Sequence, residues 1–502
     1  MRTTNPEPKA TNETVKIKAC SPARIFIFYC AILSFIAVPS AQAKSTFTKH
    51  DDALPTWITE VGARHSPTGT RIFSANSYSA VADQNKNSTT AIQKAIDACA
   101  RAGGGTVTLK PGTYVTGALF LKSNVHLRID SGVTLLGSQE DADYPLIWTR
   151  VAGVEMNWPA GLININDQHN VAVSGGGMID GRGEKWWNRY RDLRTDYDPR
   201  GLRWAADYDC QRVRLLVIWK SDDVTIKNLS LKRSGFWTTQ VVYSNHVTVD
   251  GLKISDNGGP STDGVDIDSS SYVLVQNCDI DAYDDDICLK AGRDADGLRV
   301  SLPTEYVLIK NNIAHAGAGF ITFGSETSGG IRKVVVDHNR GIDTFEGIRF
   351  KSAKTRGGFV EDVLIRDLTM DGVFLPFTFN LNWNPSYSYT LLPKDMKNIP
   401  ASWIALTTPV TPPERGLCEF RNITIENVNI TGARKIFSAE GLRERPITDV
   451  RWINISAQGR MAGTIKYARD WTMKNVRLKI LEGDDLRISG SDNVETPEFV
   501  RP

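Results

Sequence analysis

Short runs in which apolar and polar residues alternate recur along most of this chain, and each run ends in Asn, Asp or Gly. Alternation with a period of two places the apolar side chains on one face of a β-strand. Corresponding positions are 23 residues apart from Val224 to Val247, 26 apart to Val273 and 34 apart to Val307. Many similar strands at this spacing predict an all-β, single-domain, right-handed parallel β-helix, in which each coil stacks on the one before it. A β-sandwich is the alternative, but it would not explain so many near-identical units.

The ends of these runs and one long gap refine the prediction. The Asn residues at the corners are expected to stack as ladders, with their side chains bonding along the solenoid axis. The step from Val363 to Ile423 is 60 residues, which indicates an inserted loop.

One segment ahead of the strands has helical periodicity instead. Ala91, Ile92, Ala95, Ile96 and Cys99 recur at helical spacing behind the sequence Ser-Thr-Thr, which predicts a helix with a Ser/Thr cap. Three glycines at 103–105 stop it. An amphipathic helix at this place would cover the open end of the solenoid core.

The chain begins with a segment that is typical of export. Basic residues precede an apolar run of about 14 residues from Ile25 to Val38, and the run ends at Ala41-Gln42-Ala43, a good signal-peptidase site. The run is too short for a membrane span, which needs about 20 residues. We therefore expect a signal peptide at 1–43, an N-terminal extension at 44–85, the β-helix domain at 86–485 and a C-terminal tail at 486–502. The mature protein would be periplasmic or secreted, with no membrane span.

Charge and cysteines exclude several classes of protein. The whole chain carries a formal charge of +2, and loss of residues 1–43 would leave 54 Lys+Arg against 55 Asp+Glu. Without a basic field or a basic run, nucleic acid is not expected as a partner. The five cysteines after residue 43 have long spacings and no Cys-x-x-Cys, which argues against a zinc site. Buried free thiols are the simplest interpretation, although one disulfide is possible in an oxidising compartment.

Three aspartates stand out among these strands. Asp284 and Asp285 follow Asp263 by 21 and 22 residues, which is one coil of a solenoid. The three carboxyls would therefore lie almost above one another, about one strand spacing (~4.8 Å) apart. Clustered carboxylates repel, so the pattern indicates acid–base chemistry. An Asp-rich turn and a calcium site are the alternatives.

From about Tyr78 to about residue 480 the chain resembles glycoside hydrolase family 28, the pectin-degrading polygalacturonase family. The block from Ser261 to Asp268 resembles the family's Asn-Thr-Asp-Gly element, and the block from Tyr283 to Gly292 resembles its Gly-Asp-Asp element. Lys290 and Gly292 fix the register, so that Asp284 and Asp285, rather than Asp286, form the family pair.

The resemblance implies inverting hydrolysis of a galacturonide bond, with Asp284 as general acid and with Asp263 and Asp285 activating the water. Mutual repulsion is expected to raise the pKa of the carboxyl that must stay protonated. No cofactor and no metal are expected, because carboxyls serve both steps.

A further block, Gly347 to Lys351, resembles the family's Arg-x-Lys element. Alternation places Arg349 and Lys351 on the same face of a strand, where they would bind a uronate carboxylate; a solvated surface pair is the alternative.

Two departures from the family put the standard endo-polygalacturonase assignment in doubt. The family's Gly-His-Gly element is replaced by a segment with Ala318 or Gly319 where the histidine is expected, and His315 is close by but out of register. Ser261 stands where the family usually has Asn.

Aromatic residues are candidate platforms for sugar rings, although a buried packing role is equally common for them. We select Trp237 and Trp383 as substrate-binding residues. The wider set of aromatic candidates comprises Trp186, Trp187, Phe236 and Tyr387.

We expect a monomer that acts on pectin, an acidic plant polysaccharide, or on its oligosaccharides. The insertion before Ile423 would favour exo action if it closed one end of the groove. Two other functions stay open: a calcium-dependent, pectate-lyase-like β-eliminase with Arg349 as base, and a β-helix that binds polysaccharide without cleaving it.

Overall fold

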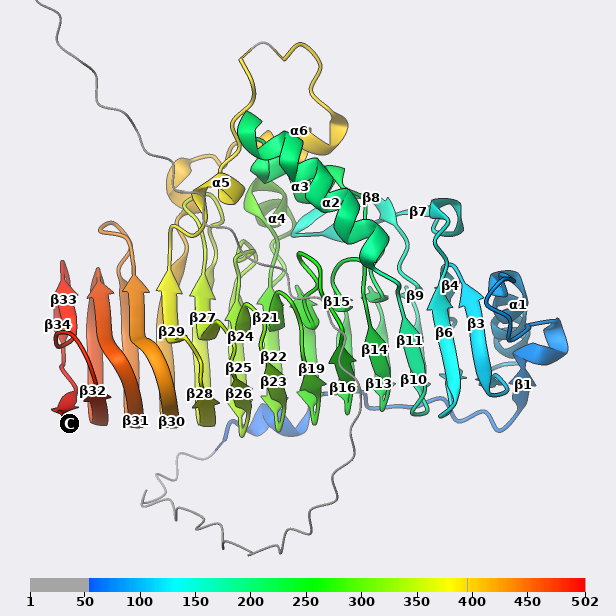
Figure 1. The fold of residues 1–502 in the computed structure, drawn as a ribbon, viewed down its shortest axis with the longest axis horizontal. Coiled ribbons are helices and arrows are strands. Elements are labelled where there is room, and N and C mark those ends of the chain that lie inside the picture. Colours follow the sequence, from blue (N-terminus) through cyan, green and yellow to red (C-terminus); the bar gives the residue numbers. More distant parts are fainter. Residues whose placement is uncertain (1–53, 395, 502) are drawn as a thin grey trace, which may run out of the picture. The chain divides into compact units, whose positions relative to one another are not determined.

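The computed structural model describes residues 54–394 and 396–501. The predicted signal peptide lies outside these residues. None of the helices in the described ranges is long and apolar enough to cross a membrane. The chain folds into a right-handed parallel β-helix, as the sequence predicts (Figure 1).

Three rows of strands run along the solenoid, and each strand pairs in parallel with the strand at the same place in the next coil. The first row contains β4 (Leu119–Phe120), β9 (Ile163–Asn166), β12 (Leu216–Trp219), β15 (Thr239–Val242), β18 (Val265–Asp268), β21 (Asp285–Lys290), β24 (Gly319–Phe323), β27 (Glu346–Lys351), β29 (Leu375–Asn380) and β33 (Arg487–Ser489). The second contains β1 (Ile72–Ser74), β2 (Gly105–Thr108), β5 (Val125–Arg128), β10 (His169–Ser174), β13 (Asp222–Lys227), β16 (Asn245–Asp250), β19 (Ser271–Gln276), β22 (Thr304–Lys310), β25 (Ile331–Asp337) and β34 (Asp492–Val494). The third contains β3 (Gly112–Thr116), β6 (Val133–Gly137), β11 (Met178–Asp180), β14 (Ser230–Lys232), β17 (Lys253–Ser255), β20 (Asp279–Ile280), β23 (Ile313–His315), β26 (Arg340–Ile342) and β35 (Glu498–Val500). Near the C-terminal end, longer strands pass through more than one row: β28 (Phe359–Asp371), β30 (Glu419–Glu440), β31 (Ile447–Lys466) and β32 (Ala468–Ile480).

The alternation of the sequence builds the core. In the first row, Val265 pairs with Ile287, Ile287 with Ile321 and Ile321 with Ile348, and all four side chains are fully buried. Apolar side chains thus stack in files along the axis, while their polar neighbours in sequence face outward.

The corner asparagines form the expected ladders. Asn277 donates its side-chain amide to Asp250 at 2.8 Å, and Asn454 donates to Asn427 at 3.0 Å. The backbone of Asn277 is left-handed, with φ of 56°, a conformation that Asn tolerates better than most residues. Asn therefore serves both the turn and the stacking.

The predicted N-terminal helix is present as α1 (Thr89–Arg101), and its buried face joins the first coils in one core. The predicted cap is different in detail. Ser88 is the N-cap residue, but its hydroxyl bonds to the Val81 carbonyl at 3.1 Å, whereas the Asn87 side chain accepts the Thr89 N–H at 2.8 Å. Asn87 therefore satisfies a free N–H of the first turn.

The sheet extends beyond the predicted domain at both ends. β1 lies within residues 44–85 and pairs with β2, and β33, β34 and β35 lie within residues 486–502 and pair with β31 and β32. These short segments therefore add the first and last rungs of the solenoid.

Several insertions emerge at the same end of the first-row strands and lie together above them in Figure 1. Val363 pairs directly with Ile423, so the 60-residue step is a single enlarged coil, as predicted. Side chains of the hairpin, α3 and α6 form a second apolar cluster, which includes Trp158, Trp204 and Trp403. The insertions comprise the antiparallel hairpin β7 (Leu146–Val151) and β8 (Val154–Pro159), α2 (Glu184–Tyr197), α3 (Arg203–Asp209), α4 (Asp294–Val300), α5 (Pro385–Ser388) and α6 (Ala401–Thr407). Short 3₁₀ turns lie at Thr56–Thr59, Ala75–Tyr78, Asp141–Asp143, Asp198–Arg200 and Pro413–Gly416.

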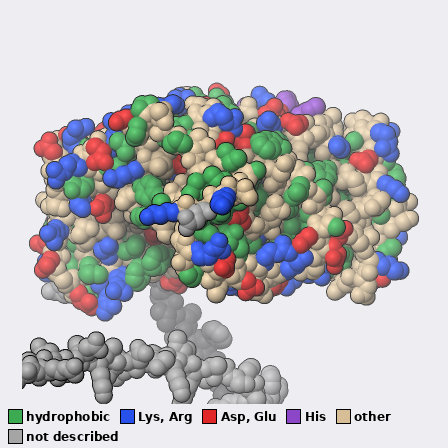
Figure 2. All heavy atoms as spheres, turned by 90° about the horizontal axis from the view of Figure 1, so that it is seen from above, with side chains coloured by type: hydrophobic (Ala, Val, Ile, Leu, Met, Phe, Trp, Pro, Cys, Tyr) green, Lys and Arg blue, Asp and Glu red, His purple; other side chains and the backbone are tan. Residues whose placement is uncertain are grey.

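Surface charge and thiols agree with the sequence. Basic and acidic side chains are interspersed on the face that carries the insertions, as Figure 2 shows. The five cysteines of the described ranges, Cys99, Cys210, Cys278, Cys288 and Cys418, are all buried and free.

Candidate active site

The first row presents a set of charged side chains outward from four neighbouring strands. Asp266 of β18 is in register with Cys288 of β21, Cys288 with Thr322 of β24, and Thr322 with Arg349 of β27. These positions alternate with the core residues of the same strands, which is why their side chains share the outer face.

The three predicted aspartates lie together on this face. The Asp263 carbonyl accepts the Thr238 N–H at 2.9 Å, and the Gly264 N–H bonds to the Asp285 carbonyl at 2.9 Å, so Asp263 and Asp285 occupy successive coils. One carboxylate oxygen from each of Asp263, Asp284 and Asp285 lies within 4.8 Å of the others. Asp263 and Asp285 are buried and Asp284 is half-buried.

Asp285 is the aspartate with the most complete set of partners. Its Oδ1 accepts hydrogen bonds from Thr322 Oγ1 at 2.8 Å and Arg349 Nη1 at 3.0 Å, and its Oδ2 accepts one from Lys351 Nζ at 2.7 Å. Burial alone would raise the pKa of Asp285, but Lys351, Arg349 and Lys290 outweigh it and lower the pKa below its usual value. These contacts therefore favour the ionised form of Asp285.

Arg349 and Lys351 share a face, as the alternation predicts, and both bind Asp285. Their predicted role toward a substrate carboxylate stays a prediction. The contact that the structure does contain gives them a different effect, which is to fix the charge of a neighbouring aspartate.

Asp286, which the register leaves out of the pair, has different surroundings. It is fully buried, and its Oδ1 accepts the Ala282 N–H at 3.2 Å. Burial, and then Asp285 and other nearby carboxylates, raise the pKa of Asp286. Asp286 is accordingly an uncharged carboxyl beneath the site.

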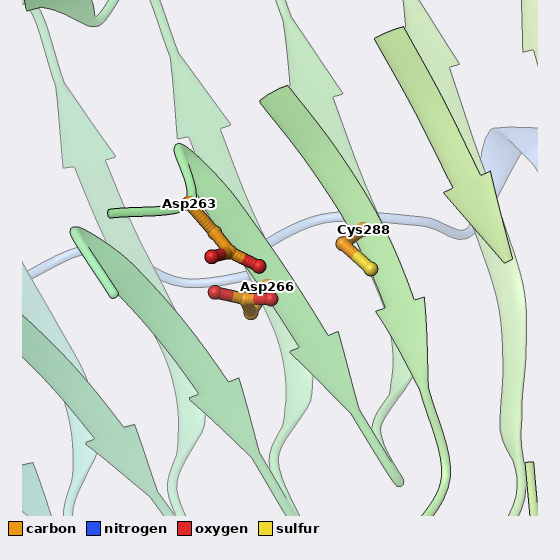
Figure 3. A group of neighbouring side chains, drawn as sticks. All are labelled: Asp263, Asp266 and Cys288. Carbon is orange, nitrogen blue, oxygen red and sulfur yellow. The ribbon is translucent and has the colours of Figure 1, made fainter. Parts of the chain in front are cut away.

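A second group of carboxyls surrounds Lys290. Its ammonium lies 3.8 Å from Asp263, 3.5 Å from Asp266 and 3.4 Å from Glu326. Figure 3 shows the Asp263 and Asp266 carboxyls facing each other, with Cys288 on the next strand. Burial, then Asp266 and Asp284, raise the pKa of Asp263 well above its usual value.

Asp266 and Glu326 are residues that sequence reasoning missed. The alternation of Val265-Asp266-Ile267-Asp268 contained a signal, because it places Asp266 on the outer face of the strand that follows Asp263. Glu326 had no such signal, since it lies beyond the end of β24 and reaches Lys290 through a tertiary contact.

Two groups of side chains at this site have the spacing of metal ligands: Asp263, Asp284 and Asp285, and Asp263, Asp266 and Cys288. In the first, Arg349 and Lys351 already neutralise Asp285. In the second, burial raises the pKa of Cys288, and its thiol lies 3.1 Å from the Gly324 carbonyl, to which it donates. Side-chain cations and a neutral thiol make both groups poor cation sites.

A pocket opens above these carboxyls. Trp237 and Trp383 both line it, whereas Trp186 and Trp187 do not. Lys290 Nζ lies 4.8 Å from the centre of the Trp237 ring, and Lys351 Nζ lies 4.6 Å from that of Trp383. Trp237 is only 4% exposed, so its contact with a ligand would be at its edge.

The opposite wall of the pocket comes from the insertions. Arg203 and Asp207 of α3 and Tyr387 of α5 line it. Arg203 donates to Asp207 at 2.6 Å, and its guanidinium lies 4.9 Å from the centre of the Tyr387 ring. The remaining N–H groups of Arg203 have no hydrogen-bond partner among the residues that the structure describes. Tyr387 donates its hydroxyl to Glu326 at 3.2 Å.

At Gly319, one of the two positions where the histidine is expected, a side chain would begin 2.5 Å from Asp285 Oδ1, so glycine suits this position. His315 pairs with Asp279 at 3.2 Å in the third row and does not line the pocket.

The sheet face beside the pocket is covered in one direction along the axis. Arg150 of the β7–β8 hairpin donates to Asp268 at 3.1 Å and to the Ser269 hydroxyl at 2.8 Å, and its carbonyl accepts a bond from Arg214 at 3.1 Å. Asp268 is fully buried as a result. In the other direction, Asn380 of β29 is half-buried and Glu440 of β30 is exposed. The sheet face is therefore covered at the N-terminal end of the pocket and more exposed beyond its C-terminal end.

Comparison with known proteins places this site in a family. The sequence model of the glycosyl hydrolases family 28 matches residues 105–446. The chain is 29% identical over 304 residues to a "Probable polygalacturonase" of Vitis vinifera, covering 58% of this chain and 59% of that protein. It is 29% identical over 342 residues to an "Exo-poly-alpha-D-galacturonosidase" of Dickeya chrysanthemi, covering 60% and 55%. These matches span less than two thirds of either relative. The fold is similar to that of the Yersinia enterocolitica family 28 exopolygalacturonase, with a TM-score of 0.72, 24% identity and coverage of 86% of this chain and 79% of that one.

Proposed function

Because the chain belongs to family 28 of the glycosyl hydrolases, we propose that it hydrolyses α-linked galacturonide or rhamnogalacturonide bonds in pectin. The observation that carries the proposal is the cluster of Asp263, Asp284 and Asp285 at the bottom of a pocket, with carboxylate oxygens within 4.8 Å. Hydrolysis of a glycosidic bond needs one carboxyl that donates a proton and another that accepts one.

The surroundings of each aspartate support a division of roles. Asp285, whose ionised form is stabilised by Arg349 and Lys351, can orient a water and accept a proton from it. Asp284 is half-buried and faces the pocket, where it can protonate the leaving oxygen. Asp263 is the second group at the water. Each bond then balances: the water oxygen bonds to the anomeric carbon, the glycosidic bond breaks, the leaving oxygen takes the proton of Asp284, and the proton that the water loses passes to Asp285.

Inversion of configuration rests on the family resemblance. Most inverting glycosidases separate their carboxyls by roughly 6.5–9.5 Å, which is more than the 4.8 Å that bounds the oxygens of this cluster. Proton NMR of the first product decides the question. Inversion of an α linkage releases the β anomer first, and early release of the α anomer would contradict it.

Exo action is supported by the closed end of the pocket. A polysaccharide chain cannot continue past the β7–β8 hairpin and α3, so the unit in the pocket would be at or near a chain end. Arg203 sits on this wall with unused N–H donors, and a guanidinium suits the carboxylate of a terminal uronate. Arg203→Met should therefore raise KM for galacturonan with little change in kcat, whereas Arg200→Met, on the exposed turn that precedes α3, should change neither.

Product analysis on both homogalacturonan and rhamnogalacturonan tests the proposal. Wild type should release reducing ends with one short product from the start, and Asp284→Asn should release almost none. Equal product from the two proteins would remove Asp284 from the mechanism. A ladder of intermediate oligomers would argue for endo action, and an unsaturated, ultraviolet-absorbing product would argue for β-elimination.

A further inference from the structure

Asp266 is the carboxyl of the site with the fewest partners. It is fully buried, does not line the pocket, and neither of its oxygens accepts a hydrogen bond from any donor of the described residues. Asp263 is in a similar position, since its Oδ1 also lacks a donor. The two carboxyls face each other, and their oxygens lie within 4.8 Å (Figure 3). Two buried, charged carboxylates at this distance would be strongly unfavourable.

The neighbouring charges do not remove this conflict. Lys290 is the cation that faces the pair, and it also serves Glu326. Asp285 adds negative charge from the next strand, and Cys288 is a neutral thiol that donates to Gly324. Arg349 and Lys351 are engaged by Asp285. One ammonium therefore faces three carboxyls. Because one positive charge cannot compensate three negative ones, we expect one of the carboxyls to be protonated.

We propose that Asp266 is a carboxylic acid in the working enzyme and that it donates a hydrogen bond to the Asp263 carboxylate. The proton belongs on Asp266 rather than Asp263 because Asp263 lines the pocket, where water can solvate its charge, whereas Asp266 does not. Asp266 is thus a positioning residue, which holds Asp263 toward the attacking water. Burial raises the pKa of Asp266 to about 8, and the Lys290 ammonium acts in the opposite direction.

This inference rests on the proposed function, in which Asp263 is the second group at the attacking water. The pair holds one proton, on Asp266, and one negative charge, on Asp263. The Asp263 carboxylate accepts a hydrogen bond from the water, while the proton that the water loses passes to Asp285. The pair therefore keeps its proton and its charge throughout the reaction.

Two substitutions separate a donor from a charge at position 266. Asp266→Asn keeps a donor and removes the ionisable group, and Asp266→Leu keeps the shape and removes both. A donor role predicts that Asn keeps kcat within about threefold of wild type, whereas Leu lowers kcat about 10²-fold through misplacement of Asp263. If Asp266 acted as an anion that holds Lys290, both variants would lose activity alike, and that result would overturn the proposal.

The pH profile gives a second readout. In wild type, ionisation of Asp266 removes the donor, so activity should fall on the alkaline side. In Asp266→Asn this limb should move to higher pH by about 1 unit or more. Asp286→Asn replaces a buried carboxyl that is already uncharged and should leave the limb in place. An unmoved alkaline limb in Asp266→Asn would contradict the proposal.

A third readout needs no substrate, so it distinguishes failure of this inference from failure of the proposed function. A carboxyl whose pKa is raised in the folded protein makes the free energy of unfolding fall as pH rises from the unfolded pKa to the folded one. Urea titrations of wild type between pH 5 and pH 8 should show this fall. In Asp266→Asn the free energy of unfolding should fall less steeply with pH, by the equivalent of about one proton. Parallel curves would show that Asp266 carries no proton, and Asp266→Ser serves the same purpose if Asn does not fold.

Discussion

Asp285 and Asp263 lie one coil apart on the same face, and their surroundings are opposite. Three donors, two of them cations, bind the oxygens of Asp285. Asp263 has a single ammonium at 3.8 Å and an oxygen with no donor. Burial acts on both, yet the pKa of Asp285 is lowered and that of Asp263 is raised. In a stacked solenoid, the ionisation of a carboxyl is thus set by the side chains that adjacent coils place beside it.

The strongest way to break this contrast is to remove the charge of Asp285. Asp285→Asn should lower kcat by about 10²–10⁴-fold, the range for loss of a general base. It also removes the anion that Lys351 binds and one of the two that Arg349 binds, the other being Glu346. Steady-state kinetics on galacturonan, with circular dichroism as the check on folding, measures the effect. A loss smaller than tenfold would assign the base to another residue.

The difference between Asp285 and Asp263 can also be reduced by removing a cation that binds Asp285. Lys351→Met removes a favourable charge from Asp285, so the pKa of Asp285 rises. Since Asp285 must be ionised to act, the acid limb of kcat should move to higher pH by about 1 unit or more. Lys354→Met is the matched control, because Lys354 pairs with Glu444 at 3.4 Å outside the pocket. If the two variants had the same acid limb, Lys351 would not set the charge of Asp285.

The lowered pKa of Asp285 should also affect the free energy of unfolding at low pH. A carboxyl with a lowered folded pKa stabilises the protein above its unfolded pKa of about 3.9, and this contribution is lost as pH falls toward the folded pKa. The free energy of unfolding of wild type should therefore drop below about pH 4. Asp285→Asn is expected to be less stable than wild type at neutral pH. Its free energy of unfolding, measured by urea titration, should depend less steeply on pH in this range, by the equivalent of about one proton. An equally steep drop in both would be inconsistent with a lowered pKa.

The smallest effect is expected at Asp286. Because its carboxyl is already uncharged, Asp286→Asn should change kcat by less than about twofold and the free energy of unfolding by about 1 kcal/mol or less. Thermal melting and kinetics on the same preparation measure both. A large loss of activity would mean that Asp286 carries charge and belongs with the cluster.

Local patterns in the sequence were enough to predict the solenoid, the corner ladders and the aspartate cluster. Each depends on a fixed spacing, as between Asp263 and Asp284, or on alternation, as between Arg349 and Lys351. The ion pairs of Arg349 and Lys351 with Asp285 were not predicted. Alternation shows on which face of a strand a long side chain lies, but it does not show which residue that side chain binds.

The wall of the pocket was also beyond prediction. Arg203 and Asp207 of α3 line the pocket from an insertion, and Arg150 of the β7–β8 hairpin covers the sheet beside it. The insertions pack on one another through residues such as Trp204 and Trp403, and this packing follows no sequence repeat. Tyr387, by contrast, was among the aromatic candidates. The closed end therefore became evident only from tertiary contacts, although the 60-residue step had indicated where an insertion begins.

The direct pairing of Val363 with Ile423 has a consequence for engineering and descent. The rungs on either side keep their register whatever length of chain loops out between them. Residues such as those of α5 and α6 can be exchanged or shortened while Asp263, Asp284 and Asp285 stay where they are. We therefore expect a graft that replaces this loop to alter the choice of polymer and to leave the position of the three aspartates unchanged.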